Sequence, residues 1–197
     1  GFVSLFNGKD LAGWEGATAM YGVDPKEPGV LQCFPERKVA GQCGNLYTKN
    51  TYSDFIYRFE FCFDVPGVNN GIGIRTEMGK DAAYEGMEIQ VLDHDNPIYA
   101  GLQPYQQHGS VYGIIVPKHI DFGAPGKWHV EEIQAIGDHV FKRRSCSSSV
   151  IIYHHSCLTT SQIATCRLSN HSGCNGVGDR RCKLGIELMV CSFFKIC

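Results

Sequence analysis

Apolar and polar residues alternate along much of the first two thirds of the chain, and this alternation predicts β-strands. In residues 54–65, DFIYRFEFCFDV, one face of the predicted strand carries five aromatic rings: Phe55, Tyr57, Phe59, Phe61 and Phe63. Further strands are expected at 71–76, 87–93, 108–117 and 128–136, with Asn-Asn-Gly at 69–71 as a tight turn. No amphipathic helix longer than about two turns is predicted. Short strands separated by turn signals predict an all-β fold, a two-sheet antiparallel sandwich or a barrel.

Composition divides the chain into two unlike parts. Residues 1–139 carry a net charge of −8 and three cysteines, whereas residues 140–197 carry a net charge of +6 and seven cysteines. The second part shows no sustained period, and its cysteine spacings lack the close pairs of a zinc site. We therefore expect a β-sandwich domain over 1–139 and an atypical Cys/Ser-rich tail over 140–197. The tail is either a disulfide-rich appendage or the product of a shifted reading frame.

The bulk properties exclude some functions and bear on the compartment. The net charge of −2 gives no indication of a nucleic-acid partner, and no run approaches the roughly 18 apolar residues of a membrane span. The first residues lack the features of a signal peptide, so an exported protein would already have lost its signal. In an exported chain Cys33 and Cys43 could close a loop disulfide, while two unpaired thiols are the alternative.

Ionisable residues are concentrated in residues 86–95, GMEIQVLDHD. On a strand, Met87, Ile89 and Val91 would face the core, so Glu88 and Gln90 would project from the opposite face. Asp93 falls on the core side unless a bulge turns it towards Glu88. An ordinary solvated strand face is the alternative to a functional row.

Two neighbouring segments add to this row. Gly71 and Gly73 would leave an open floor around Arg75, and glycines within a strand often mark the close approach of a ligand. His108, Ser110 and Tyr112 would alternate on one face of the next strand, although His108 alone could be a structural histidine. Together these side chains would form one polar patch of the kind that binds sugars. It consists of Arg75, Glu88, Gln90, His108, Ser110 and Tyr112.

The motifs resemble those of a known family. FVSLFNGKDLAGWEG, NNGIGIRT, AYEGMEIQVLDHD, QPYQQHGSVYGI and GKWHVEEIQAIGDH, in this order over residues 2–139, are similar to the 3-keto-disaccharide hydrolase domain family. The resemblance implies a concanavalin A-like lectin/glucanase fold, a carbohydrate ligand, bacterial origin and export to the periplasm or cell surface. The closing strands typical of the family are not visible in residues 140–197.

The resemblance also implies a chemistry. In a 3-keto glycoside the ketone acidifies the proton on carbon 2, a base removes that proton, the aglycone leaves, and water adds back. Glu88 or His108 could be the base, Arg75 or Tyr112 the enolate stabiliser, and Asp93 or His108 the proton donor. Sugar contacts would come from Gln90, Ser110, Tyr112, His94 and Trp128. The cofactor is left open: the sequence assigns no metal site, yet a divalent metal held by Glu88, Asp93 or His108 could replace Arg75.

Two other functions stay open at this stage. One is ordinary glycoside hydrolysis, as in laminarinase-type glucanases, with Glu88 and Asp93 as the paired carboxylates. The other is a non-catalytic carbohydrate-binding module in which Trp14 or Trp128 stacks on a sugar ring. Fold alone separates none of these functions.

Overall fold

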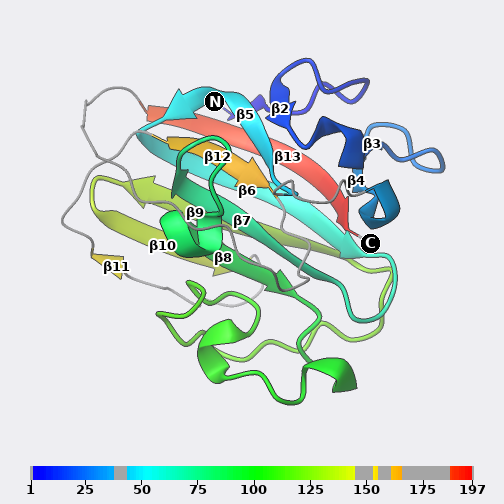
Figure 1. Cartoon of the computed structure of the whole chain (residues 1–197), viewed down its shortest axis with the longest axis vertical. Coiled ribbons are helices and arrows are strands. Elements are labelled where there is room, and N and C mark those ends of the chain that lie inside the picture. Colours follow the sequence, from blue (N-terminus) through cyan, green and yellow to red (C-terminus); the bar gives the residue numbers. More distant parts are fainter. Residues whose placement is uncertain (1, 38–43, 145–152, 155–160, 166–186, 197) are drawn as a thin grey trace.

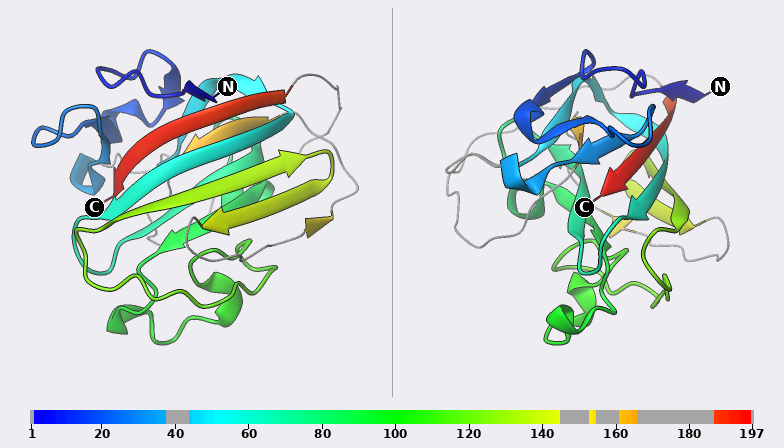
Figure 2. Two further views of the ribbon diagram at one scale, coloured as in Figure 1. Left: turned by 180° about the vertical axis from the view of Figure 1, so that it is seen from behind. Right: turned by 90° about the vertical axis from the view of Figure 1, so that its right-hand side faces the viewer.

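The computed structural model describes residues 2–37, 44–144, 153–154, 161–165 and 187–196, with side chains as far as residue 142. Its strands form two sheets (Figures 1 and 2). The eight-stranded sheet contains β1 (Phe2–Ser4), β3 (Tyr21–Val23), β4 (Leu31–Cys33), β6 (Asp54–Phe63), β9 (Trp128–Ile136), β10 (His139–Arg144), β11 (Tyr153–His154) and β13 (Glu187–Ile196). The five-stranded sheet contains β2 (Trp14–Gly16), β5 (Leu46–Tyr52), β7 (Asn69–Thr76), β8 (Met87–Leu92) and β12 (Ser161–Thr165).

The predicted two-sheet β-sandwich is confirmed. Within the described residues, helix is limited to α1 (Ala82–Glu85) and four 3-10 turns: Thr18–Met20, Pro35–Arg37, Pro97–Tyr99 and Pro104–Gln106. The larger sheet has the order β11-β10-β9-β6-β13-β4-β3, and the smaller has the order β2-β5-β12-β7-β8. Most pairs are antiparallel, as expected, but β13 runs parallel to β6, β4 and β1. No helix in the described part of the chain is long and apolar enough to cross a membrane.

The core lies between the two sheets. The aromatic stripe of β6 supplies one side of it, and its five rings are buried as predicted: Phe55, Tyr57, Phe59, Phe61 and Phe63. Ile72, Ile74 and Ile89 of the smaller sheet close the core from the other side. Burial of each large side chain contributes about 1.5–3 kcal/mol, so this stripe is a main source of stability.

Two predicted local structures are wrong. Asn69 and Asn70 are the first residues of β7, so the Asn-Asn-Gly sequence lies in a strand rather than in a turn. Residues 108–117 form no continuous strand, because Gly109 and Gly113 adopt positive φ angles of 84° and 76° that interrupt an extended chain. Of the predicted strand there remain two isolated bridges, Ile89 with Val111 and Val111 with Ile115.

Described parts of the tail belong to both sheets. β12 lies between β5 and β7, and β13 lies between β6 and β4 (Figure 1). The boundary expected at residue 139 coincides with the start of β10, which pairs with β9 in a hairpin. The division into two parts and the shifted reading frame stay predictions. Cys43 lies outside the described residues, so its pairing with Cys33 also stays a prediction.

Candidate functional site

Polar side chains form short rows on the outward face of the five-stranded sheet. Strand pairing places Tyr47, Gly73 and Glu88 in one row across the sheet. Residue 164 of β12 pairs with Tyr47 of β5 on one side and with Gly73 of β7 on the other, and Gly73 pairs with Glu88 of β8. The next row contains Gly71 and Gln90. Because directly paired residues share a face, these side chains lie opposite the core. We call this surface the polar face; it consists of Tyr47, Gly71, Gly73, Glu88 and Gln90, together with Ser110 and Tyr112.

Ser110 and Tyr112 join the polar face from the segment beside β8. Gln90 N donates to Ser110 O at 3.0 Å, and Tyr112 N donates to Glu88 O at 2.9 Å. These bonds flank the bridge between Ile89 and Val111 and place Ser110 beside Gln90 and Tyr112 beside Glu88. Both residues therefore lie on the face that the sequence predicted.

Glycines make room for the Glu88 carboxylate. A Cβ atom added to Gly71 would overlap with Glu88 Oε1, so no side chain is tolerated beside the carboxylate without a shift. Gly73 stands directly opposite Glu88 on β7. The space over Gly71 is thus filled by the Glu88 carboxylate itself, so the open floor predicted around Arg75 is not observed. Helix α1 lies in front of β7 and β8 in Figure 1, and Glu88 is 4% exposed.

Two buried oxygens on the polar face have no hydrogen-bond partner among the described residues. They are Gln90 Oε1 and Ser110 Oγ, on side chains that are 3% and 0% exposed. The amide of Gln90 is held in place, because Nε2 donates to Asn69 Oδ1 at 3.0 Å. A buried polar atom without a hydrogen-bond partner costs about 1–3 kcal/mol of stability. A polar ligand that supplies the missing hydrogen bonds to these two oxygens would therefore be favoured.

Tyr112 presents a hydroxyl that can donate. Gln106 Nε2 donates to Tyr112 Oη at 2.9 Å. This bond uses a lone pair of the oxygen and leaves the phenolic proton for another acceptor. The side chain is partly exposed, so a ligand could reach it.

His108 was expected on the polar face, and this expectation is wrong. The turn at Gly109, with φ at 84°, reverses the direction of the side chain, and His108 points into the core. His108 Nε2 lies 2.7 Å from Glu131 Oε1, and Lys142 Nζ lies 2.8 Å from the same carboxylate oxygen. His108 Nδ1 accepts from Leu92 N at 3.1 Å. The histidine therefore connects the edge strand of one sheet to β9 and β10 of the other.

The charge states of this buried group follow from its contacts. Because Nδ1 accepts a bond, the neutral ring carries its proton on Nε2 and donates it to Glu131. Burial, opposed by the Glu131 charge, lowers the pKa of His108 to about 3. Burial opposes ionisation of Glu131, but the neighbouring His108 and Lys142 outweigh it and lower the pKa of Glu131 to about 2. A fully buried, neutral His108 cannot serve as base or proton donor on the polar face.

Two further expected members are also absent from the polar face. Arg75 adopts a φ of 56°, which breaks the alternation of β7, and its Nη2 donates to Gly137 O of the β9–β10 turn at 2.6 Å. The ladder between β7 and β8 shows no bulge before Asp93. Asp93 instead accepts from Gly67 N at 2.7 Å and caps the turn that precedes β7. Neither side chain is placed to act with Glu88.

The two tryptophans also lie elsewhere. Trp128 pairs with Cys62 at the start of β9 and faces outwards from the other sheet, where it is 36% exposed. Trp14 is buried in the core at 2% exposure. Stacking of either ring on a sugar held at the polar face is therefore not supported by the fold.

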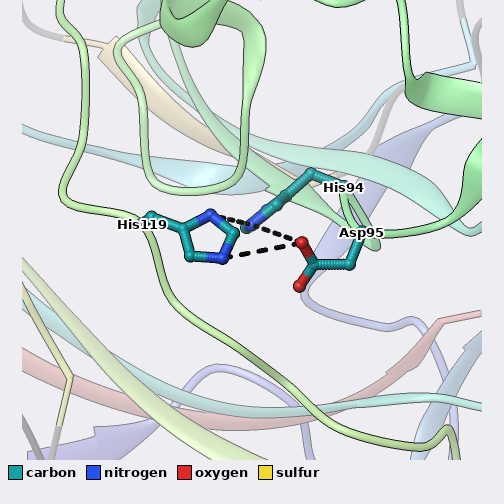
Figure 3. Close-up of side chains that lie close together, drawn as sticks. All are labelled: His94, Asp95 and His119. Atoms are coloured by element: carbon teal, nitrogen blue, oxygen red, sulfur yellow. Dashed lines mark hydrogen bonds and ion pairs between the residues drawn. The ribbon is translucent and has the colours of Figure 1, made fainter.

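A second group of chemically active side chains lies just beyond β8. His94, Asp95 and His119 converge (Figure 3), and within the described residues they are the one set of three side chains spaced for a metal ion. His94 was expected to contact sugar, whereas Asp95 and His119 were not singled out. The sequence places His119 in a loop without any periodic pattern, so no signal pointed to it.

Solved structures share the fold at low sequence identity. A "putative glycosyl hydrolase" from Parabacteroides distasonis aligns with a TM-score of 0.67 and 19% identity, covering 85% of this chain and 87% of that one. A second structure of that description, from the same organism, gives 0.56 and 21%, covering 83% and 75%. The carbohydrate-binding module CBM66 from Bacillus subtilis gives 0.50 and 14%, covering 84% and 91%. No curated protein matches the chain.

The family comparison places the chain among carbohydrate-active β-sandwich domains. A family model described as a 3-keto-alpha-glucoside-1,2-lyase-like domain matches residues 1–159. The chain belongs to this family, and the resemblance inferred from its motifs is confirmed. The match continues past residue 139, where the recognisable motifs end.

Proposed function

We propose that the polar face binds a 3-keto glycoside and that Glu88 removes the proton from carbon 2 of the keto sugar. The observation that carries the proposal is that Glu88, Gln90 and Ser110 share the polar face. Two of its buried oxygens, Gln90 Oε1 and Ser110 Oγ, have no hydrogen-bond partner among the described residues, and Gly71 leaves room for the Glu88 carboxylate. The family description, which names a lyase acting on 3-keto glucosides, supplies the substrate class.

The reaction would run in two balanced steps. Glu88 takes the proton from carbon 2, and the electron pair of that bond forms a double bond between carbon 2 and carbon 3 while the ketone oxygen takes up the negative charge. The ketone then re-forms, the electron pair moves into a double bond between carbon 2 and carbon 1, and the bond from carbon 1 to the aglycone oxygen breaks. The aglycone oxygen keeps the electron pair of that bond and gains a proton from water, and the hydroxide left behind takes the proton from Glu88, which restores the carboxylate and the water. Water can afterwards add across the new double bond, with hydroxyl at carbon 1 and hydrogen at carbon 2, which completes a net hydrolysis.

The neighbours of Glu88 would stabilise the charge that this step creates. Negative charge develops on the oxygen at carbon 3 when the proton leaves, and a donor aimed at that oxygen lowers the barrier. Tyr112 fits this role, since its proton is not used in its bond with Gln106. Gln90 Oε1 would accept a sugar hydroxyl, and the Ser110 hydroxyl could donate or accept. With Arg75, Asp93 and His108 directed elsewhere, Glu88 is the remaining candidate base.

A binding module without catalysis is the second candidate function. Its support is the fold likeness to CBM66, a carbohydrate-binding module. The same polar face would then hold sugar hydroxyls through Gln90, Ser110 and Tyr112. A laminarinase-type pair of carboxylates has less support, because the Asp93 carboxylate is bound to Gly67 N rather than placed beside Glu88.

Activity on matched substrates tests the proposal. The purified chain is incubated with an aryl 3-keto-glucoside and with its unoxidised parent, each with and without chelator, and release of the aryl alcohol is followed. We expect turnover of the keto sugar only. Equal turnover of both glycosides would indicate ordinary glycoside hydrolysis, and saturable binding without turnover would indicate a binding module. Either result would overturn the proposed chemistry.

Export to the periplasm or cell surface is part of the same proposal, since the family resemblance implies it. It predicts that the native protein is found in the periplasmic or surface fraction of its bacterial cell. Recovery in the cytoplasmic fraction alone would contradict it.

A further inference from the structure

We infer that His94, Asp95 and His119 form a site for a divalent transition-metal ion of the zinc type. The site is separate from the polar face, because none of the three side chains belongs to it. A bound ion would connect the loop that carries His119 to the residues that follow β8. This inference does not depend on the proposed reaction.

The spacing of the donor atoms fits one ion. His94 Nε2 lies 3.2 Å from His119 Nδ1 and 3.8 Å from Asp95 Oδ1, and His119 Nε2 lies 3.6 Å from Asp95 Oδ1. Two atoms bonded to one zinc ion at about 2.0–2.1 Å in a tetrahedral arrangement lie about 3.4 Å apart. All three residues offer a ligand atom within 4.8 Å of the others. Only one ring nitrogen of His119 can bind the ion, so the 3.2 Å and 3.6 Å contacts, made by different nitrogens, are alternatives. A rotation of the His119 ring, which is 59% exposed, would bring one nitrogen into the set.

The kinds of donor select the kind of metal. Two imidazoles and one carboxylate suit zinc, cobalt, nickel or iron, whereas calcium and magnesium prefer oxygen ligands alone. Three protein ligands also leave room for water in the remaining position. The side chains of Asp95 and His119 are 48% and 59% exposed, so an ion has access from solvent.

The buried member of the site is fixed in place. The His94 ring packs edge-on against Phe122, with 5.7 Å between ring centroids. His94 is only 7% exposed, so the surrounding side chains hold its ring in one position. The exposed side chains of Asp95 and His119 thus converge on a buried imidazole at the end of β8 (Figure 3).

One contact limits the affinity. His108 N donates to His94 Nδ1 at 3.3 Å, which puts the proton of the neutral ring on Nε2. If a metal ion binds His94 Nε2, the ring proton must move to Nδ1, which can then no longer accept the hydrogen bond from His108 N. The loss is small, because this bond is already long. Metal-binding histidines normally donate their second N–H to an acceptor. We therefore expect a site of moderate affinity from which the ion exchanges readily.

Titration with Co²⁺ tests the inference on the full chain. The wild type is compared with His119→Ala and Asp95→Asn, and His139→Ala serves as control because it removes an exposed imidazole from β10. Absorption bands of bound Co²⁺ report the ligands, and thiolate ligands from the tail cysteines would give a distinct charge-transfer band. Thermal unfolding with and without Co²⁺ gives a second readout, since an ion that binds the folded state raises Tm.

The expected result is one nitrogen- and oxygen-bound Co²⁺ per chain in the wild type and in His139→Ala. Loss of a partner outside the ligand shell already weakens metal binding about 10- to 100-fold, so His119→Ala and Asp95→Asn should each weaken it at least about 100-fold. The rise in Tm should vanish with them. Unchanged affinity in His119→Ala, or no binding by the wild type at millimolar Co²⁺, would overturn the inference.

Discussion

His108 and Glu131 meet inside the sandwich, with 2.7 Å between His108 Nε2 and Glu131 Oε1 and both side chains fully buried. The contact joins the segment beside β8 to β9 of the opposite sheet. Lys142 shares the carboxylate and compensates its charge. Because Ser110 and Tyr112 follow within four residues of His108, this contact also fixes where these two residues bring their hydroxyl groups to the polar face.

Removal of the Glu131 charge should strongly destabilise the fold. Glu131→Gln would leave Lys142 buried beside a neutral partner, and breaking a buried ion pair costs about 3–5 kcal/mol. Glu132→Gln is the matched control on the same strand. Glu132 pairs with Arg58, whose side chain is 45% exposed, and such pairs contribute about 0–1 kcal/mol. Urea unfolding at pH 7 measures both losses, and equal losses would argue against a buried ion pair.

Acid should destabilise the protein over a window set by the same two residues. In the unfolded chain His108 takes up a proton near pH 6.5 and Glu131 near pH 4.5. In the folded chain the pKa of His108 is lowered to about 3 and that of Glu131 to about 2, so both residues take up their protons only in stronger acid. Stability is therefore lost as pH falls from 6.5 towards 2. Each such proton contributes a slope of up to about 1.4 kcal/mol per pH unit. The urea concentration at the midpoint of unfolding should therefore decrease between pH 7 and pH 4.5. If it does not, the conclusion that His108 is neutral in the folded protein is contradicted.

A methyl group at residue 71 should disable the polar face. Gly71→Ala places its Cβ against the Glu88 carboxylate, and such overpacking typically costs about 1–3 kcal/mol and displaces neighbours. We expect turnover of the keto glycoside to fall at least tenfold. Gly101→Ala is the control, because its Cβ meets no atom within 4 Å. Full activity in Gly71→Ala would mean that the position of Glu88 is not critical.

The phenol of Tyr112 should contribute to the rate. Tyr112→Phe removes the proposed donor to the enolate oxygen, and loss of one such donor typically costs about 10²–10³-fold in kcat. Tyr105→Phe is the nearby control on an exposed ring. Steady-state kinetics on the aryl 3-keto-glucoside separate the two. A change in KM alone would make Tyr112 a binding residue instead.

The sequence predicts best where the chain alternates without interruption. The burial of Phe55, Phe59 and Phe63 follows from the period of β6, and the outward direction of Glu88 and Gln90 follows from that of β8. Each face of such a strand meets one environment along its whole length. Whether a residue stands at an odd or an even position along the strand then determines whether its side chain is buried.

Prediction fails where one residue leaves the extended conformation. Arg75 and Gly109 have positive φ angles, and each reverses the direction of a side chain that alternation had assigned to the polar face. The sequence does not report φ, so Arg75 and His108 were misplaced. Glu131 did leave a signal, because it shares the parity of Ile133 and Ala135, two buried apolar residues of β9. A charge on a core-facing position indicates a buried partner, here His108 and Lys142.

The most direct test of the central claim is proton exchange at carbon 2, compared between the wild type and Glu88→Gln. In D₂O, the wild type should exchange the carbon-2 proton of a bound 3-keto glycoside for deuterium, which NMR detects as loss of that signal. Glu88→Gln should slow exchange and turnover together by about 10²–10⁴-fold, the usual contribution of a positioned base. Glu60→Gln on β6 of the other sheet should change neither. Exchange at the wild-type rate in a folded Glu88→Gln protein would contradict the assignment of Glu88 as the base.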